Sequence, residues 1–158
     1  MFPAAGWISG FGESMSVLSV RNLKKYFPIG RKFSLSRGGS VRAVDGVSLE
    51  VQRGQIVGLV GESGCGKTTA GRAILRLIEP TEGRVLFDGE DLTAASGPDL
   101  RRFRRRMQIV FQDPYSSLDP RMSVLRIIKE PLDNFFSELN SRQKRDRVAG
   151  NLERVGLR

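Results

Sequence analysis

Nine consecutive residues, 61–69, combine three glycines with a lysine and two threonines in the order GESGCGKTT. This order fits the pattern G-x-x-x-x-G-K-[ST], in which a glycine-rich loop wraps its backbone N–H groups around phosphate oxygens. Lys67 adds a full positive charge that reaches the β- and γ-phosphates, and the hydroxyl of Thr68 is the hard oxygen ligand that Mg²⁺ prefers. The residues therefore predict a site for a nucleoside triphosphate and Mg²⁺.

The segments on either side of this loop have the patterns that its chemistry requires. Residues 55–60 (QIVGLV) form a short, mostly apolar run that predicts a buried strand. Residues 69–78 predict a helix, because apolar residues recur there at helical spacing. These residues are Ala70, Ala73, Ile74 and Leu77. A helix that begins at Gly66 directs its free N–H groups, equivalent to about half a positive charge, toward the same anion.

The composition is that of a soluble globular protein. Of the 158 residues, 39% are hydrophobic and 27% are charged, and no apolar run approaches the length of a membrane span. Cys65 is the single cysteine, which excludes a disulfide framework. A net charge of +9 raises nucleic acid or an anionic membrane surface as partners. The charge is concentrated in residues 101–106 and 142–147, which we interpret as solvated helix faces because no zinc-finger or recognition-helix pattern accompanies them.

The rest of the chain predicts a small antiparallel sheet before the loop and mixed strands and helices after it. Residues 17–23 and 47–51 indicate two strands, separated by a basic loop at residues 29–40 and a tight turn at Asp45-Gly46. The later elements are predicted in this order: a strand at 84–87 with a turn at 88–89, a helix at 98–106, a strand at 107–111, an apolar helical patch from 124 to 128, and a last helix capped by Asn140 or Ser141.

A second group of polar residues follows the predicted strand at residues 107–111. Gln112 can place a neutral oxygen near Mg²⁺ and the γ-phosphate. Asp113 offers the alternative of a carboxylate that helps to hold the metal, as a P-loop kinase would use it. The spacing alone rejects neither assignment.

Three stretches of the sequence together resemble one family, the nucleotide-binding subunits of ABC transporters. VGESGCGKTTAGRAILRLIEPTEGRVLFDGEDL covers the loop, its helix and the following hairpin. VRAVDGVSLEV precedes it, and FQDPYSSLDPRM at residues 111–122 resembles the oligopeptide and dipeptide importers most. The resemblance covers about residues 16–158. It implies an α/β P-loop NTPase fold with an N-terminal antiparallel β-subdomain and the beginning of a helical subdomain.

The resemblance also implies the parts of the chain and the residues of its site. Residues 1–14 would be an extension, 15–113 the ATP-binding core and 114–158 the beginning of the helical subdomain. Thr68 and Gln112 would meet Mg²⁺, while Phe27, with Tyr26 as the alternative, would stack on adenine. The residues implied to contact ATP are Phe27, Ser63, Gly64, Cys65, Gly66, Lys67, Thr68, Thr69 and Gln112.

The implied partners are membrane-spanning permease subunits, a second ATP-binding subunit and a peptide cargo, at the cytoplasmic face of the plasma membrane. Nickel and antibiotic-peptide systems look similar, so the cargo stays open. The sequence has no LSGGQ-like signature, no apolar run that ends in Asp-Glu and no histidine. It therefore looks like the N-terminal half of such an ATPase and is expected to bind ATP without hydrolysing it. The alternatives are a basic P-loop NTPase that acts on nucleic acid and a P-loop kinase that uses Asp113.

Overall fold

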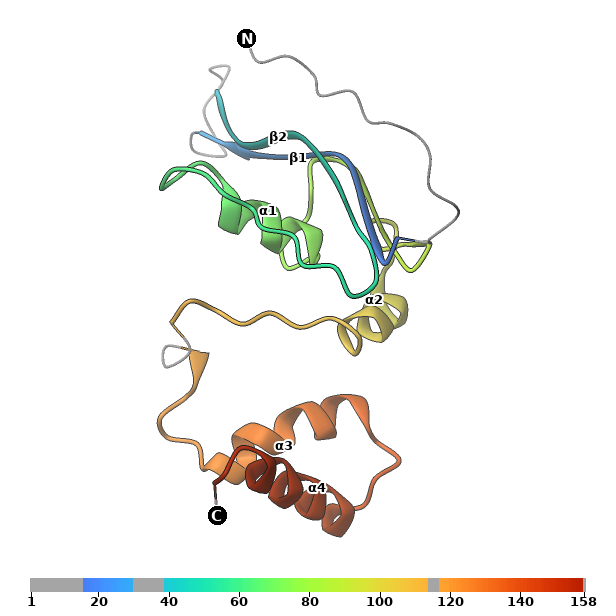
Figure 1. The fold of residues 1–158 in the computed structure, drawn as a ribbon, viewed down its shortest axis with the longest axis vertical. Helices are drawn as coiled ribbons and strands as arrows, with labels where there is room; N and C mark the ends of the chain where they lie inside the picture. The colour runs from blue at the N-terminus through green and yellow to red at the C-terminus, as the bar shows by residue number, and fades with distance from the viewer. Residues whose placement is uncertain (1–15, 30–38, 114–116, 158) are drawn as a thin grey trace. The chain divides into compact units, whose positions relative to one another are not determined.

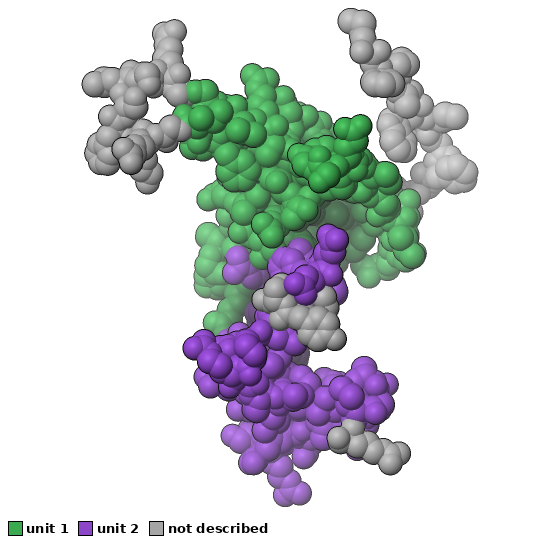
Figure 2. Space-filling model, turned by 90° about the vertical axis from the view of Figure 1, so that its left-hand side faces the viewer, with its two compact units in different colours: residues 1–103 green, residues 104–158 purple. Residues whose placement is uncertain are grey.

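The computed structural model describes residues 16–29, 39–113 and 117–157. The chain divides into two compact units, residues 1–103 and residues 104–158, coloured green and purple in Figure 2. The expected extension at residues 1–14 and most of the expected loop at residues 29–40 lie outside the described residues.

The first unit is built on a four-stranded antiparallel sheet, as the sequence predicts for its opening part (Figure 1). Its strands are β1 (Leu18–Pro28), β2 (Ser40–Val51), β3 (Glu82–Phe87) and β4 (Glu90–Asp91), in the order β2-β1-β3-β4. The central strand β1 pairs Leu18 with Val51 of β2 and with Phe87 of β3. The helix α1 (Lys67–Ile74) contacts β1 and β2. It begins two residues before the predicted helix and ends four residues earlier.

The core of this unit lies between the sheet and α1. Each buried aliphatic side chain contributes about 1.5–3 kcal/mol through the area it removes from water. The small side chains of Ala70 and Ala73 let α1 approach the strands closely. Phe87 meets Phe103 of α2 (Gly97–Arg104) edge to face, with ring centroids 6.2 Å apart. The sheet residues buried in this core are Val20, Leu23, Val44 and Val85.

The predicted tight turn at Asp45-Gly46 is wrong, because β2 runs through both residues. Gly46 has φ +74°, a left-handed conformation that glycine adopts without steric cost. The register between β1 and β2 shifts at this point, from Leu23 opposite Val47 to Lys25 opposite Val44. The Asp-Gly pair therefore forms a bulge inside the strand instead of a reversal of the chain.

The predicted strands at residues 55–60 and 107–111 are also wrong, since neither segment has regular secondary structure. Ile56, Val60 and Val110 are 96%, 93% and 90% exposed. An extended apolar segment becomes a buried strand only when a neighbour satisfies its backbone groups and covers its side chains. None of the described strands pairs with either segment.

The second unit contains a helical hairpin made of α3 (Val124–Phe135) and α4 (Ser141–Arg154). Asn140 caps α4 as predicted: its side chain accepts from the Gln143 N–H at 3.0 Å, and the Gln143 side chain accepts from the Asn140 N–H at 2.9 Å. Val148 of α4 is buried, and the Lys144 Nζ donates to Asp133 of α3 at 2.9 Å. A reciprocal cap and an interhelical ion pair thus fix this hairpin.

Candidate functional site

The glycine-rich loop enters α1 through two residues in the left-handed conformation. Gly64 has φ +81°, and Gly66, the residue that precedes the helix, has φ +97°. A Cβ atom at Gly66 would lie 2.0 Å from the carbonyl oxygen of Ala43 in β2. Gly66 is therefore required both by its backbone angle and by close packing of the loop on β2. This packing presents the free N–H groups of the first turn of α1 toward the loop.

Lys67, the first residue of α1, curls back onto its own loop. Its Nζ donates to the carbonyl oxygens of Gly61 at 2.6 Å and Glu62 at 2.5 Å, and lies 3.4 Å from the Sγ of Cys65. Carbonyl oxygens are neutral acceptors, whereas a phosphate oxygen carries a negative charge and adds ionic attraction to the hydrogen bond with an ammonium. The loop therefore holds a cation that can exchange two carbonyl oxygens for phosphate oxygens.

A cavity of about 340 Å³ adjoins this loop in the first unit. A volume of this order is typical of small-molecule sites. Its charged lining residues are the cations Lys67 and Arg42 and the anion Asp45, and this positive balance together with the backbone N–H groups of the loop favours an anion. Ser63 and Thr68 are exposed beside it, and Thr69 is half-buried. The lining residues are Arg42, Ala43, Val44, Asp45, Val47, Leu59, Val60, Cys65, Gly66, Lys67 and Ala70.

The two aromatic residues near the end of β1 have different surroundings. Phe27 is 41% exposed, and the Nζ of Lys25 lies 5.0 Å from the centroid of its ring. The hydroxyl of Tyr26 donates to Asp45 Oδ1 at 2.5 Å, and the guanidinium of Arg42 lies 5.6 Å from the centroid of the Tyr26 ring. Neighbouring strand residues point to opposite faces of a sheet, so the rings of Tyr26 and Phe27 lie on opposite faces.

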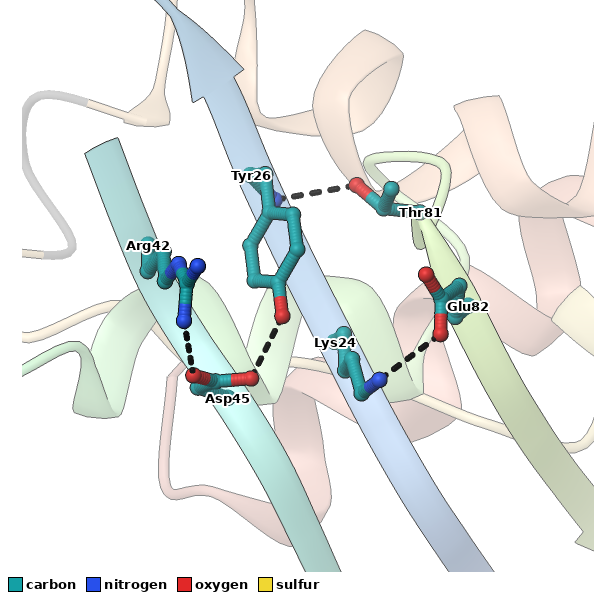
Figure 3. Close-up of polar contacts among 6 residues, drawn as sticks. All are labelled: Lys24, Tyr26, Arg42, Asp45, Thr81 and Glu82. Atoms are coloured by element: carbon teal, nitrogen blue, oxygen red, sulfur yellow. Dashed lines mark hydrogen bonds and ion pairs between the residues drawn. The ribbon is translucent and has the colours of Figure 1, made fainter. Parts of the chain in front are cut away.

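The Tyr26–Asp45 hydrogen bond belongs to a polar network that ties β2, β1 and β3 together (Figure 3). The hydrogen bond from Tyr26 and the Arg42 guanidinium hold the pKa of Asp45 below its usual value. The same hydrogen bond raises the pKa of Tyr26. The Tyr26 N–H also donates to Thr81 Oγ1 at 2.9 Å. This network stabilises β2 next to the bulge, where Ala43 meets Gly66.

A second ion pair in Figure 3 joins β1 to β3, between the Lys24 Nζ and Glu82 Oε2 at 2.8 Å. Glu82 raises the pKa of Lys24 through this hydrogen bond. Sequence reasoning missed the contribution of Ala43 and Asp45, because it placed a turn where β2 continues. The register between β1 and β2 is the signal that could have revealed these two residues, because it places this part of β2 against the glycine loop.

Gln112 and Asp113 belong to the second unit, and both side chains are exposed. They follow a segment without regular structure, so no strand positions them. Their placement toward Thr68 stays a prediction. Within the described part of the chain, no three His, Cys, Asp or Glu side chains gather closely enough to hold a metal ion. In the same part, no helix combines the length and the apolar character needed to cross a bilayer.

Comparison with known sequences identifies the family of the chain. The profile of the family described as ABC transporter matches residues 44–158. The oligopeptide transport ATP-binding protein AppF of Bacillus subtilis (strain 168) is 47% identical over 143 residues, which are 90% of this chain and 43% of that protein. The probable peptide ABC transporter ATP-binding protein y4tS of Sinorhizobium fredii is 46% identical over 91% of this chain and 40% of its own length. The chain thus spans less than half the length of these curated relatives.

Solved structures of ATP-binding cassettes share the fold. The cassette MJ0796, in a dimeric post-hydrolysis state bound to ADP and Pi, superposes with a TM-score of 0.70 at 26% identity, over 89% of this chain and 58% of that one. The cbiO1 protein of Clostridium perfringens, part of the ABC transporter complex cbiONQ, gives a TM-score of 0.65 at 27% identity, over 90% and 51%. The structure is therefore a partial P-loop NTPase fold, as the sequence predicts. The family match and the shared fold lead to one conclusion: this chain belongs to the ABC transporter family.

Proposed function

We propose that this chain supplies the ATP-binding part of an ABC-type importer for oligopeptides or dipeptides. The observation that carries the ATP site is the geometry of the glycine loop, in which Gly66 packs against Ala43 and Lys67 is held by two carbonyl oxygens. The peptide cargo rests on the two curated relatives, which are named as peptide-transport ATP-binding proteins. The family match does not favour the nucleic-acid and kinase alternatives.

The phosphates would bind at the beginning of α1. The N–H groups of the loop and of the first helical turn would surround the oxygens, and Lys67 would contact the β- and γ-phosphates. Phe27 is the stacking partner for adenine that the geometry favours, because its ring is partly open while the Tyr26 hydroxyl already bonds Asp45. The residues proposed for the loop contacts are Ser63, Gly64, Cys65, Gly66, Lys67, Thr68 and Thr69.

The residues fit Mg²⁺ as a partner of the nucleotide. The exposed Thr68 hydroxyl is in the first turn of α1 and is a hard oxygen ligand, and we assign Gln112 as the second protein ligand. Mg²⁺ keeps several waters and takes phosphate oxygens as ligands, so it does not require a preformed cluster of carboxylates. When bound, the ion neutralises part of the charge on the β- and γ-phosphates.

The remaining assignments concern the subunits around the chain. We assign the ATP-binding core to residues 15–113 and the beginning of a helical subdomain, which would contact a membrane-spanning permease, to residues 114–158. A second ATP-binding subunit would complete the assembly, which would lie at the cytoplasmic face of the plasma membrane as a peripheral component. No catalytic group is assigned within residues 1–158, and ATP turnover is not expected from them alone.

Peptide uptake tests this function. Cells that carry the Lys67→Ala substitution in the chromosomal gene should lose uptake of a radiolabelled tripeptide or pentapeptide, because the loop no longer holds the γ-phosphate. Arg53→Ala, which removes one positive charge from the turn after β2 and does not line the cavity, is the control and should leave uptake within about twofold of wild type, since an exposed ion pair contributes little. Normal peptide uptake in the Lys67→Ala cells, or loss of Ni²⁺ uptake instead, would contradict the assigned cargo.

A further inference from the structure

A groove in the helical hairpin of the second unit carries positive charge that the nucleotide site does not use. Its volume is about 370 Å³, and it is lined by Leu132 of α3 with Arg147, Gly150, Asn151 and Arg154 of α4. The four α4 residues follow the spacing i, i+3, i+4 and i+7, which places them along one face over two turns. Two guanidinium groups and one amide thus face the groove, and none of its lining residues is acidic.

No acidic residue lies three or four positions from either arginine along the chain; Asp146 and Glu153 directly precede them, and side chains one position apart on a helix do not face each other. Residues three and four positions from Arg147 are Gln143, Lys144, Gly150 and Asn151, so no i, i+4 ion pair is available to it. Among the described residues, neither Arg147 nor Arg154 forms an ion pair with a carboxylate.

Asp133, which follows the groove residue Leu132 in α3, already has two cationic partners. Asp133 of α3 accepts from Lys129 at 3.2 Å and from Lys144 at 2.9 Å. Both lysines lower the pKa of Asp133 through these hydrogen bonds, Lys144 more than Lys129, so the carboxylate keeps its charge and its partners. Asp133 therefore does not neutralise the groove arginines, which form no ion pair among the described residues.

Arg147 and a second arginine, Arg105, both contact the ring of Phe136. The guanidinium carbon of Arg147 lies 5.4 Å from the ring centroid of Phe136, and that of Arg105 lies 4.1 Å from the same centroid. The ring attracts each cation, but the two cations repel each other. Contact with the ring orients the Arg147 side chain and reduces the entropy that it would lose on binding an anion.

Gly150 lies between the two arginines, in the interior of α4. Glycine in a helix interior is less favourable than alanine, so its presence needs a reason. Its φ is not left-handed, and no atom lies within 4 Å of the place where a Cβ would stand. Neither backbone conformation nor packing among the described residues requires it. The missing side chain leaves the floor of the groove open.

We propose that this groove binds a phosphate group between Arg147 and Arg154, with the Asn151 amide as a third donor. Residues seven apart on a helix are separated by about 10.5 Å along its axis, a span across which two long arginine side chains can converge. The planar guanidinium fork matches phosphate oxygens in pairs, which a lysine does not. The phosphate can be free or can belong to a phospholipid headgroup. The site is separate from the glycine loop and does not depend on the proposed nucleotide site.

The test uses the full chain carrying Lys67→Ala, so that the glycine loop contributes as little as possible to the phosphate binding that is measured. Inorganic phosphate is titrated by calorimetry, and sedimentation measures binding to phosphatidylcholine vesicles with or without phosphatidic acid. Arg147→Gln and Arg154→Gln should each weaken phosphate binding at least about tenfold, the loss expected for one charge-assisted contact. Arg142→Gln is the matched control: it removes the same charge from α4 but does not line the groove, and should change the affinity less than about twofold.

Gly150→Ala separates binding from folding. Alanine is the better helix former, so this variant should unfold at a higher temperature, while its methyl group narrows the groove and weakens phosphate binding several-fold. Binding to phosphatidic-acid vesicles without binding of inorganic phosphate would identify a lipid headgroup, and binding of both would show that the phosphate group suffices. Equal affinity in wild type, Arg147→Gln and Gly150→Ala would overturn the proposal. So would binding of an acidic peptide with no response to either phosphate source.

Discussion

The Nζ of Lys67 donates hydrogen bonds to the carbonyl oxygen of Gly61 at 2.6 Å and to that of Glu62 at 2.5 Å. The lysine of the phosphate loop is therefore held by the loop to which it belongs. A triphosphate has to replace these two contacts, and it can do so because charged oxygens are stronger acceptors than carbonyl oxygens. The loop thus begins from a closed arrangement, and its cation is already positioned at the cavity that β2 helps to form.

Gly66 and Gly64 form a matched pair for testing how the loop packs on β2. Both have positive φ, so alanine at either position adopts a left-handed conformation at a cost of about 1–2 kcal/mol. Only at Gly66 would the new Cβ also meet the Ala43 carbonyl oxygen, at 2.0 Å. Gly66→Ala should therefore lose clearly more stability in urea unfolding than Gly64→Ala. Equal losses in the two variants would show that contact with Ala43 does not constrain the loop.

Asp45 should give the sheet a stability that depends on pH. Its pKa is lowered in the folded protein, by the Tyr26 hydrogen bond first and by Arg42 next, so the folded state favours the ionised carboxylate. The contribution is present above the unfolded pKa of about 3.9 and is lost as the pH falls below it toward the folded pKa. Asp45→Asn should accordingly lower the urea midpoint at neutral pH, and the difference from wild type should shrink as the pH falls through the folded pKa. A difference between wild type and variant that grows as the pH falls would contradict this assignment.

Local patterns predicted the parts of the molecule that depend on neighbouring residues only. The glycine loop, the Asn140 cap of α4 and the turn at residues 88–89 are as the sequence indicates, because a few consecutive residues determine each of them. The apolar segments at 55–60 and 107–111 were predicted wrongly, since a strand also needs a pairing partner that the segment itself does not specify.

The same distinction explains the prediction at Asp45-Gly46. An Asp-Gly pair favours a left-handed glycine, and Gly46 does have φ +74°. Whether that glycine reverses the chain or bulges a continuous strand depends on the register with β1, which is a property of two segments. Ala43 and Asp45 line the cavity because of this register. The sequence of one segment does not specify the register, so their role could not be predicted.

Phe27 and Tyr26 should differ in their effect on nucleotide binding. Stacking of a base on an aromatic side chain contributes about 1–3 kcal/mol, so Phe27→Ala should weaken ATP binding roughly five- to a hundredfold. Binding of tripolyphosphate, which has no base, should not change. Tyr26→Phe keeps the ring and removes only the hydroxyl that bonds Asp45, and should leave ATP affinity within about twofold. Calorimetric titration measures these affinities in wild type and in both variants. A larger loss of ATP affinity in Tyr26→Phe than in Phe27→Ala would assign adenine stacking to Tyr26 instead.

Substitutions of Gln112 and Asp113 test whether the metal is held as in a transporter ATPase or as in a kinase. If Gln112 is the second protein ligand of Mg²⁺, Gln112→Ala should reduce the gain in ATP affinity that Mg²⁺ produces, and Asp113→Ala should reduce it less. Titrations with and without Mg²⁺ give this gain for each variant. A larger loss in Asp113→Ala would assign the metal to the carboxylate.

The most direct test of the central claim is a titration of the chain with a fluorescent ATP analogue in the presence of Mg²⁺, before and after Lys67→Ala. The substitution removes a charge-assisted contact worth about 1.5–3 kcal/mol, so the affinity should fall about ten- to a hundredfold. Lys129→Ala in α3 removes the same charge far from the loop in sequence and should bind like wild type. Equal affinities for wild type and Lys67→Ala would contradict the assignment of residues 61–69 as the nucleotide site.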